Sequence, residues 1–280
     1  MNNTFLQAIE TIINEGFVED IGSGDLTSDL LIAPETKTTA VLIAKADGVI
    51  AGLPVVEAVF KRLDKDVKFS IEKNDGQTVQ TGELIASISG SYRALLTGER
   101  LALNFLQRMS GIATETARYV KAVEGYKTEI LDTRKTAPGL RLLDKYAVKT
   151  GGGTNHRMGL YDMVMIKDNH ISVAGGITKA IEAIRPKIEA GIQIEVETTT
   201  LDEVKEALAA RADIIMLDNM DTASMKKAVE LIAGRVKVEA SGNMTLERVK
   251  EVAATGVDYI SIGALTHSVK ALDISQKIAE

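Results

Sequence analysis

The chain has 280 residues, of which 45% are hydrophobic and 26% are charged, proportions typical of a folded globular protein and not of a disordered one. Lysine and arginine number 33 against 39 aspartates and glutamates, and the net charge of −6 disfavours binding to a polyanion such as duplex DNA. Cysteine is absent, which excludes disulfides, thiolate metal sites and a cysteine nucleophile, and which favours a reducing, cytoplasmic setting.

The opening segment MNNTFLQAIETIINEGF is not expected to be a signal peptide. It has no basic start, and Glu10 and Glu15 interrupt its apolar pattern. Charged residues also interrupt every window of about 18 residues along the chain, so no membrane span is predicted.

A small β-sheet is predicted between Thr38 and Ile88. Short apolar runs in this region are separated by turn signals such as Asn74-Asp75-Gly76 and Thr81-Gly82. The stretch KNDGQTVQTGELIASI is similar in architecture to the carrier domains that hold biotin or lipoate, but no lysine has the hairpin-tip setting of those carriers. From Ala94 to about Val123 apolar residues recur at a spacing close to 3.6, which predicts one long helix.

The second half of the chain repeats a strand–helix unit. Six β-rich runs follow one another: EILDT, DMVMIKD, IQIEVET, DIIMLDN, VKVEASGN and DYISIGAL. The last four begin about 21–23 residues apart, the length of one tight β-α unit. We therefore expect an α/β fold with an incomplete (β/α) TIM-like barrel. The alternative is an open doubly wound sheet, which is less favoured because no G-x-G-x-x-G opens a helix after the first strand.

Cationic side chains follow the first two predicted barrel strands. Arg134, Lys135 and Lys167 come directly after them, and His156 and Arg157 lie in the loop between them. The carboxyl ends of parallel barrel strands form the active-site face, and arginine forks bind carboxylates or phosphates bidentately. The pattern predicts a small substrate with several negative charges. For any one of these residues the alternative is an ion pair with an acid of a neighbouring strand.

Two acids end adjacent strands. Glu197 and Asp218 could share a Mg²⁺ ion, which prefers oxygen ligands, or could accept hydrogen bonds from sugar hydroxyls. Transition-metal chemistry is not expected, because His156, His170 and His267 lack metal-ligand spacing and no thiol is present.

Loops that contain glycine follow the last two strands. Small residues let backbone N–H groups approach an anion, and barrel phosphate sites often use these two loops. The loops comprise Ser241, Gly242 and Asn243, and Ser261, Ile262, Gly263 and Ala264. The triple glycine 151–153 is expected to form a mobile, close-packed loop beside the substrate. Together these features predict transfer chemistry on a phosphorylated sugar.

Long motifs of the chain resemble the quinolinate phosphoribosyltransferase family, also called carboxylating nicotinate-nucleotide pyrophosphorylases. The resemblance runs nearly end to end. It rests on EDIGSGDLTS (Glu19–Ser28), GERLALNFLQRMSGIAT (Gly98–Thr114), DTRKTAPGLR (Asp132–Arg141) and KYAVKTGGGTNHRMGLYDMVMIKDNH (Lys145–His170).

The resemblance implies a fold, a reaction and an assembly. It implies an N-terminal α/β sandwich over residues 1–110, to which the tail 268–280 returns, and an incomplete barrel over residues 111–267. Quinolinate and phosphoribosyl pyrophosphate would give nicotinate mononucleotide, pyrophosphate and CO₂ with Mg²⁺, in NAD biosynthesis. The family also implies a homodimer whose sandwich domain closes the partner's barrel, and it leaves dimer against hexamer open.

The resemblance further implies roles for individual residues. Quinolinate would be held by Arg100, contributed by the partner subunit, and by Arg134, His156, Arg157 and Lys167. The ribose and Mg²⁺ would lie near Lys135, Glu197 and Asp218, with Thr133 also in contact with substrate. The two glycine-containing loops, with His267, would contact the phosphate and pyrophosphate groups. The catalytic set would be Lys135, Lys167, Glu197 and Asp218.

Three rival functions fit the sequence less well. A paralogue on the same scaffold would use another pyridine acid or act near molybdate transport, but the set of cations favours a dicarboxylate. A non-catalytic carrier or interaction protein leaves the acids and glycines at the strand ends unexplained. An aldolase would need a Schiff-base lysine, for which Lys167 is the one good candidate, and its charged surroundings argue against that.

Overall fold

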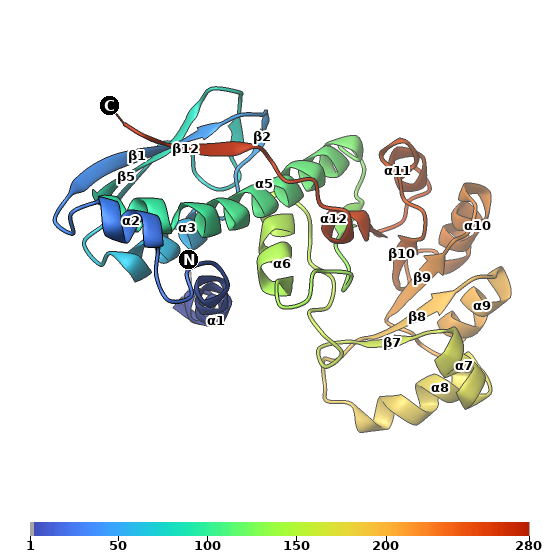
Figure 1. Ribbon diagram of the computed structural model, residues 1–280. Coiled ribbons are helices and arrows are strands. Elements are labelled where there is room, and N and C mark those ends of the chain that lie inside the picture. The colour runs from blue at the N-terminus through green and yellow to red at the C-terminus, as the bar shows by residue number, and fades with distance from the viewer. Residues whose placement is uncertain (1–2, 280) are drawn as a thin grey trace. The chain divides into compact units, whose positions relative to one another are not determined.

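The computed structural model describes residues 3–279, which divide into two compact units (Figure 1). The first unit comprises the described residues up to 117, residues 136–152 and the chain from residue 265 onward. The second comprises residues 118–135 and 153–264. The domain boundary at residue 110 stays a prediction. None of the helices in the described part of the chain is long and apolar enough to cross a membrane.

The first unit is built on a four-stranded antiparallel sheet in the order β12-β1-β5-β3. Its strands are β1 (Lys37–Ala44), β3 (Lys68–Ile71), β5 (Leu84–Ser91) and β12 (Ile274–Ile278), and a separate pair joins β2 (Gly48–Val49) to β4 (Thr78–Val79). Alternate residues of β1, namely Ala40, Leu42 and Ala44, are fully buried, as expected for a strand with one face on a core. The tail of the chain adds β12 antiparallel to β1.

Helices complete the first unit. They are α1 (Asn3–Asp20), α2 (Leu26–Leu31), α3 (Leu53–Leu63), α4 (Tyr92–Thr97), α5 (Glu99–Ala122), α6 (Arg141–Thr150) and α12 (Ala264–His267). Two of them cross the division between the units: α5 ends within the second unit, and α12 begins at the final residue of the second unit. The start of α3 is capped by the Asp75 carboxylate, which accepts hydrogen bonds from the N–H groups of Gly52 and Leu53 at 2.8 and 3.1 Å. The Tyr146 hydroxyl of α6 donates to the same carboxylate at 2.8 Å and so ties α6 to this cap.

The expectation of one helix over residues 94–123 is wrong in detail, because α4 and α5 meet at Gly98. A Cβ atom at Gly98 would lie 2.9 Å from the Leu63 side chain and 3.0 Å from Phe60. The absence of a side chain lets α3 pack closely at the point where one helix ends and the next begins.

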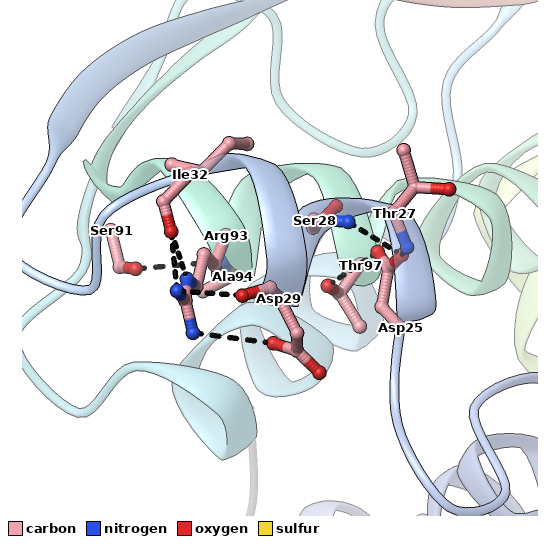
Figure 2. Close-up of polar contacts among 9 residues, drawn as sticks. All are labelled: Asp25, Thr27, Ser28, Asp29, Ile32, Ser91, Arg93, Ala94 and Thr97. Atoms are coloured by element: carbon pink, nitrogen blue, oxygen red, sulfur yellow. Dashed lines mark hydrogen bonds and ion pairs between the residues drawn. The ribbon is translucent and has the colours of Figure 1, made fainter.

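The GDLTS segment forms α2 and its cap (Figure 2). The Asp25 carboxylate accepts hydrogen bonds from the N–H groups of Thr27 and Ser28 at 3.1 and 3.0 Å. Hydrogen bonding from Ser28, through its side chain first and its backbone second, lowers the pKa of Asp25. The Arg93 guanidinium of α4 donates to the Ile32 carbonyl, which closes the far end of α2. On the outer side of this helix three leucines are exposed: Leu26, Leu30 and Leu31.

The second unit is a six-stranded parallel sheet in the order β6-β11-β10-β9-β8-β7. Its strands are β6 (Glu129–Leu131), β7 (Val164–Ile166), β8 (Ile194–Thr198), β9 (Ile214–Asp218), β10 (Lys237–Ser241) and β11 (Tyr259–Ser261), so all six predicted strands are confirmed. From β7 to β11 each strand pairs with the next strand along the chain. The first strand, β6, pairs with β11 and not with β7, so β6 and β7 form the two edges of the sheet. This cyclic order with one gap is that of an incomplete barrel, since a doubly wound sheet would reverse its order once.

Helices cover the outer face of the second sheet (Figure 1). They are α7 (Asp168–Ala174), α8 (Ile177–Ile184), the short η1 (Arg185–Lys187), α9 (Leu201–Ala209), α10 (Thr222–Ile232) and α11 (Leu246–Ala253). Their inward residues recur at helical spacing and are buried, for example Met225, Ala228 and Ile232 of α10. The outer face of the sheet is therefore apolar, and the polar strand residues are left for its inner face.

Candidate active site

Strand register gathers polar side chains into layers on the inner face of the barrel. Residues paired across parallel strands point to the same side, and Glu197 pairs with Met216, which pairs with Glu239. One step closer to the carboxyl ends, Asp218 pairs with Ser241. The acids predicted to end adjacent strands therefore do share the inner face.

Arg134 and Arg157 are two of the cations predicted for this site. The Arg157 guanidinium donates a hydrogen bond to the Met163 carbonyl at 2.9 Å. Burial lowers the pKa of Arg157, and the charge on Arg134 lowers it further, so the two guanidinium groups lie close enough to repel each other. A bound anion with two carboxylates would relieve that repulsion by accepting from both forks.

Lys167 ends β7 and forms an ion pair with Glu197 on β8. The alternative of an ion pair with a neighbouring acid therefore applies to Lys167. His170 has a structural role here: its Nδ1 accepts the Lys167 backbone N–H at 3.0 Å and caps the start of α7.

The floor of the barrel holds a buried His156–Glu195–Glu239 cluster, hereafter the buried cluster. Nε2 of His156 lies 3.2 Å from Glu195 and 3.4 Å from Glu239, and the two glutamates are 0% and 1% exposed. Burial lowers the pKa of His156, but the two carboxylates outweigh this effect and raise it to about 10. Burial and the charge on Glu239 raise the pKa of Glu195.

The buried cluster therefore shares at least one proton at neutral pH. The Arg157 backbone N–H approaches Nδ1 of His156 at 2.7 Å, and this contact disfavours a proton on Nδ1. The shared proton lies between Nε2 and the carboxylates, so its loss belongs to the three groups together and not to one residue. Nε2 of His156 is thus directed at Glu195 and Glu239, contacts that the position of His156 in the sequence did not reveal.

The chain around His156 is anchored to β6. Thr154 forms a single parallel bridge with Leu131, and the Thr154 N–H donates to the Ile130 carbonyl at 2.8 Å. The fully buried Asp132 carboxylate accepts the His156 N–H at 2.9 Å. Within the triple glycine just before this segment Gly151 is close-packed, because a Cβ there would lie 2.4 Å from the Ala113 carbonyl oxygen. That the loop is mobile and lies beside the substrate stays a prediction.

The loops after β9 and β10 are tied to each other. The Asn219 N–H donates to the Ser241 carbonyl at 3.0 Å, and the Asn243 side chain donates to Asn219 Oδ1 at 3.2 Å. Asn219, Gly242 and Asn243 all have positive φ, and a Cβ at Gly242 would lie 2.2 Å from Asn219 Oδ1. Glycine is therefore required at position 242 by this close approach.

Arg248 of α11 forms hydrogen bonds with the same loops, a role that was not predicted from the sequence. Its guanidinium donates to the carbonyls of Met220 at 2.7 Å, Gly242 at 3.1 Å and Asn243 at 3.4 Å. In a trans peptide the N–H points opposite to the carbonyl, so carbonyls turned toward Arg248 turn the following N–H groups away from it. An arginine in the first turn of the helix after a glycine loop is the signal that could have identified it.

The last loop begins at the end of β11. The Ser261 hydroxyl is buried and accepts or donates no hydrogen bond among the described residues, and the Ile262 N–H donates to the Leu131 carbonyl at 2.9 Å. Thr133 Oγ1 accepts the Lys135 N–H at 3.1 Å, which shapes the turn after β6. Arg100 and His267 belong to the first unit, so their places in the site stay predictions.

The donor set suits the magnesium ion that the resemblance implies. Glu197 and Asp218 offer carboxylate oxygens, which Mg²⁺ prefers, and Asp218 Oδ2 also accepts the Asn219 side-chain amide at 2.9 Å. The buried cluster is a second group of metal-type donors, with ligand atoms all within 4.8 Å of one another.

Comparison with known proteins gives one consistent result. Residues 112–277 match the model of the quinolinate phosphoribosyl transferase C-terminal domain, and residues 25–110 match that of the N-terminal domain. A probable carboxylating nicotinate-nucleotide pyrophosphorylase of Bacillus subtilis is 46% identical over 96% of this chain and 93% of its own length. The chloroplastic enzyme of Oryza sativa is 49% identical over 96% of this chain and 77% of its own length.

Solved structures agree with the sequence relatives. NadC from Streptococcus pyogenes superposes with a TM-score of 0.95 at 42% identity and covers 100% of both chains. The nicotinate-nucleotide pyrophosphorylase from Francisella tularensis superposes with a TM-score of 0.93 at 42% identity and covers 98% of this chain and 97% of its own.

Proposed function

Because the chain belongs to the quinolinate phosphoribosyltransferase family, we propose that it transfers the phosphoribosyl group of phosphoribosyl pyrophosphate to quinolinate. Loss of CO₂ then gives nicotinate mononucleotide, with release of pyrophosphate, in NAD biosynthesis. The single observation that carries this proposal is the match of residues 25–110 and 112–277 to the two domains of the family. Arg134 and Arg157, whose positive charges repel each other, suit a substrate with two carboxylates.

The first task of the site is to hold quinolinate. Quinolinate is a pyridine with two adjacent carboxylates, and Arg134 and Arg157 can each offer a planar fork to one of them. Lys167 adds a compact positive charge, which Glu197 holds in place until the substrate enters. This arrangement orients the pyridine nitrogen toward the sugar and needs no nucleophile from the protein.

The second task is to stabilise the departing pyrophosphate. Bond breaking leaves an oxocarbenium-like sugar, so preorganised positive charge near the leaving group is the main catalytic contribution. Lys135 supplies part of that charge, and Glu197 and Asp218 would hold Mg²⁺, which when bound adds further charge stabilisation. The loops of residues 241–243 and 261–264 offer backbone N–H groups to the phosphates.

Decarboxylation follows from the product of transfer. Once the pyridine nitrogen is attached to the ribose it is positively charged, and this charge stabilises the electron pair that the departing CO₂ leaves on the adjacent ring carbon. The residues around the substrate need only hold the carboxylate in a dry pocket, and a proton then replaces it on the ring carbon.

We also propose a homodimer in which Arg100 completes the partner's site. The exposed leucines of α2, each 79% exposed or more, support this because monomers rarely leave such groups uncovered. Mixing inactive Arg100→Ala and Lys167→Ala variants under subunit exchange should restore about a quarter of the wild-type activity, since half of the random dimers would carry one intact site. Failure of demonstrably exchanged variants to complement would contradict a shared site.

A cytoplasmic location is part of the same proposal. The absence of cysteine supports it, because nothing in the chain depends on an oxidising compartment. Cell fractionation with an antibody to the protein would test it, and recovery outside the cytoplasmic fraction would contradict it.

The activity is tested by offering quinolinate and nicotinate side by side with phosphoribosyl pyrophosphate and Mg²⁺. Nicotinate mononucleotide and CO₂ from quinolinate alone are the expected products. Product from nicotinate instead would keep the transferase and overturn the substrate, and no product from either acid would overturn the activity.

A further inference from the structure

The buried cluster is left unused by the proposed reaction. Glu195 and Glu239 come from β8 and β10, on either side of β9, and their carboxylates meet beneath the His156 ring. Oε1 of each glutamate is buried and has no hydrogen-bond partner among the described residues. Burying two carboxylates is costly unless a specific partner repays it, so a purely apolar floor would be the simpler way to fill this barrel.

We propose that Glu195 and Glu239 are positioning residues for quinolinate binding, which hold the His156 ring and through it fix Arg157. The inference rests on the proposed function. It adds one requirement to that function: the Arg157 guanidinium is aligned for quinolinate only while Glu195 and Glu239 hold the His156 ring.

The contacts around His156 give the route of this effect. The ring is held at Nε2 by the two carboxylates, and its Nδ1 accepts the N–H of Arg157, the next residue. The His156 N–H is held by Asp132. A ring fixed at both nitrogens fixes the backbone from which the Arg157 side chain extends, and a shift of the ring would be passed directly to that side chain.

Charge gives Glu195 a second effect on the same fork. The charges that act on the Arg157 guanidinium are the positive charge of Arg134 and the negative charges of Glu195 and Asp162. The Glu195 carboxylate thereby offsets part of the repulsion between the two guanidiniums. Removal of the Glu239 charge should therefore act on Arg157 through the His156 ring.

A divalent cation is the rival occupant of the buried cluster, because one imidazole and two carboxylates also suit zinc. The Nε2–oxygen distances of 3.2 and 3.4 Å are those of ion pairs between the imidazole and the two carboxylates, so the three groups compensate one another's charge without a metal. Metal analysis of the purified protein separates the two explanations.

The test is Glu239→Gln, which keeps the shape of the side chain and removes its charge. We expect the KM for quinolinate to rise about tenfold while the KM for phosphoribosyl pyrophosphate stays within about twofold, because only the dicarboxylate contacts are displaced. A purely structural role would lower the melting temperature and the active fraction and leave both KM values unchanged. Glu206→Gln is the matched control, since that carboxylate binds Thr178 of α8 on the outside of the barrel.

His156→Gln provides a second variant and a coupling test. It should raise the same KM, and the double variant with Glu239→Gln should be no worse than the weaker-binding single variant, because both changes break one chain of contacts. If Glu239→Gln does not fold, Glu195→Gln takes its place, because Glu195 holds the same ring at Nε2.

Three results would overturn the inference. The first is a Glu239→Gln variant that folds but has the same KM for quinolinate as an active wild-type protein. The second is stoichiometric zinc in the wild-type protein that is lost in Glu239→Gln. The third is a wild-type protein that neither turns over nor binds quinolinate. This result would also overturn the proposed function, which distinguishes it from the other two.

Discussion

Each unit of the molecule buries carboxylates, and the two units partner them differently. In the first unit the Asp144 carboxylate is fully buried and receives both arms of Arg108, at 2.9 and 2.8 Å, so each oxygen is satisfied. In the second unit Glu195 and Glu239 share one histidine, and Oε1 of each has no hydrogen-bond partner among the described residues. Fully paired buried charge is what a role in the fold requires, whereas the proposed role of the two glutamates in substrate binding rests on their incomplete pairing.

The largest effect on activity should come from the cations above the buried cluster. Arg134→Ala should lower kcat/KM for quinolinate about 100- to 1,000-fold, or roughly 3–4 kcal/mol, because a charged partner of a desolvated carboxylate is lost. Steady-state kinetics measures it. Thermal unfolding should stay within about 2 °C of the wild type, and a near-normal kcat/KM would contradict the clamp.

Removal of the paired charge in the first unit should instead lower the stability of the fold. Arg108→Met should lower the free energy of unfolding by about 3–5 kcal/mol, because it leaves the Asp144 carboxylate buried without its partner. Urea denaturation measures this loss, with Lys121→Met at the other end of α5 as a surface control. A loss below about 1 kcal/mol would show that the pair is not needed for the fold.

A third substitution separates the phosphate loops from the buried cluster. Arg248→Met should raise the KM for phosphoribosyl pyrophosphate about tenfold, because the loop carbonyls of Met220 and Gly242 lose their common donor. The KM for quinolinate should stay near its wild-type value, the reverse of the pattern expected for Glu239→Gln. Equal changes in both KM values would mean that Arg248 supports the barrel as a whole.

The buried cluster should also give a pH dependence of stability. The folded pKa of His156 is raised to about 10 from an ordinary value of 6.5, so the folded cluster keeps a proton that the unfolded chain releases. This stabilisation is fully present below pH 6.5 and is lost as the pH rises through about 10. Melting temperatures measured across this range should fall more steeply for the wild type than for His156→Gln, and parallel curves would contradict the shared proton.

The barrel could be predicted from the sequence because its signals are local. Each strand is a β-rich run and each helix a run of period 3.6, and the polar residues at the strand ends stand out along the chain. The break at Gly98 could not be predicted, since the helical pattern continues across it and the cause is the close approach of α3.

The site was predicted by residue type better than by contact. Arg157, Glu197 and the 241–243 loop follow from chemistry that is expected at strand ends, and their roles in binding and catalysis stay predictions. The link between His156 and the glutamates joins three distant parts of the chain, and no spacing announces it. Arg248 was missed because an arginine on a helix surface is ordinary until its carbonyl partners are known.

The most direct test of the substrate clamp is a crystal structure of the protein with quinolinate bound. We predict both carboxylates within hydrogen-bond distance, about 2.7–3.1 Å, of the Arg134 and Arg157 guanidiniums, with the His156 ring still held over Glu195 and Glu239. Quinolinate bound elsewhere, or in this barrel with its carboxylates turned away from both arginines, would contradict it.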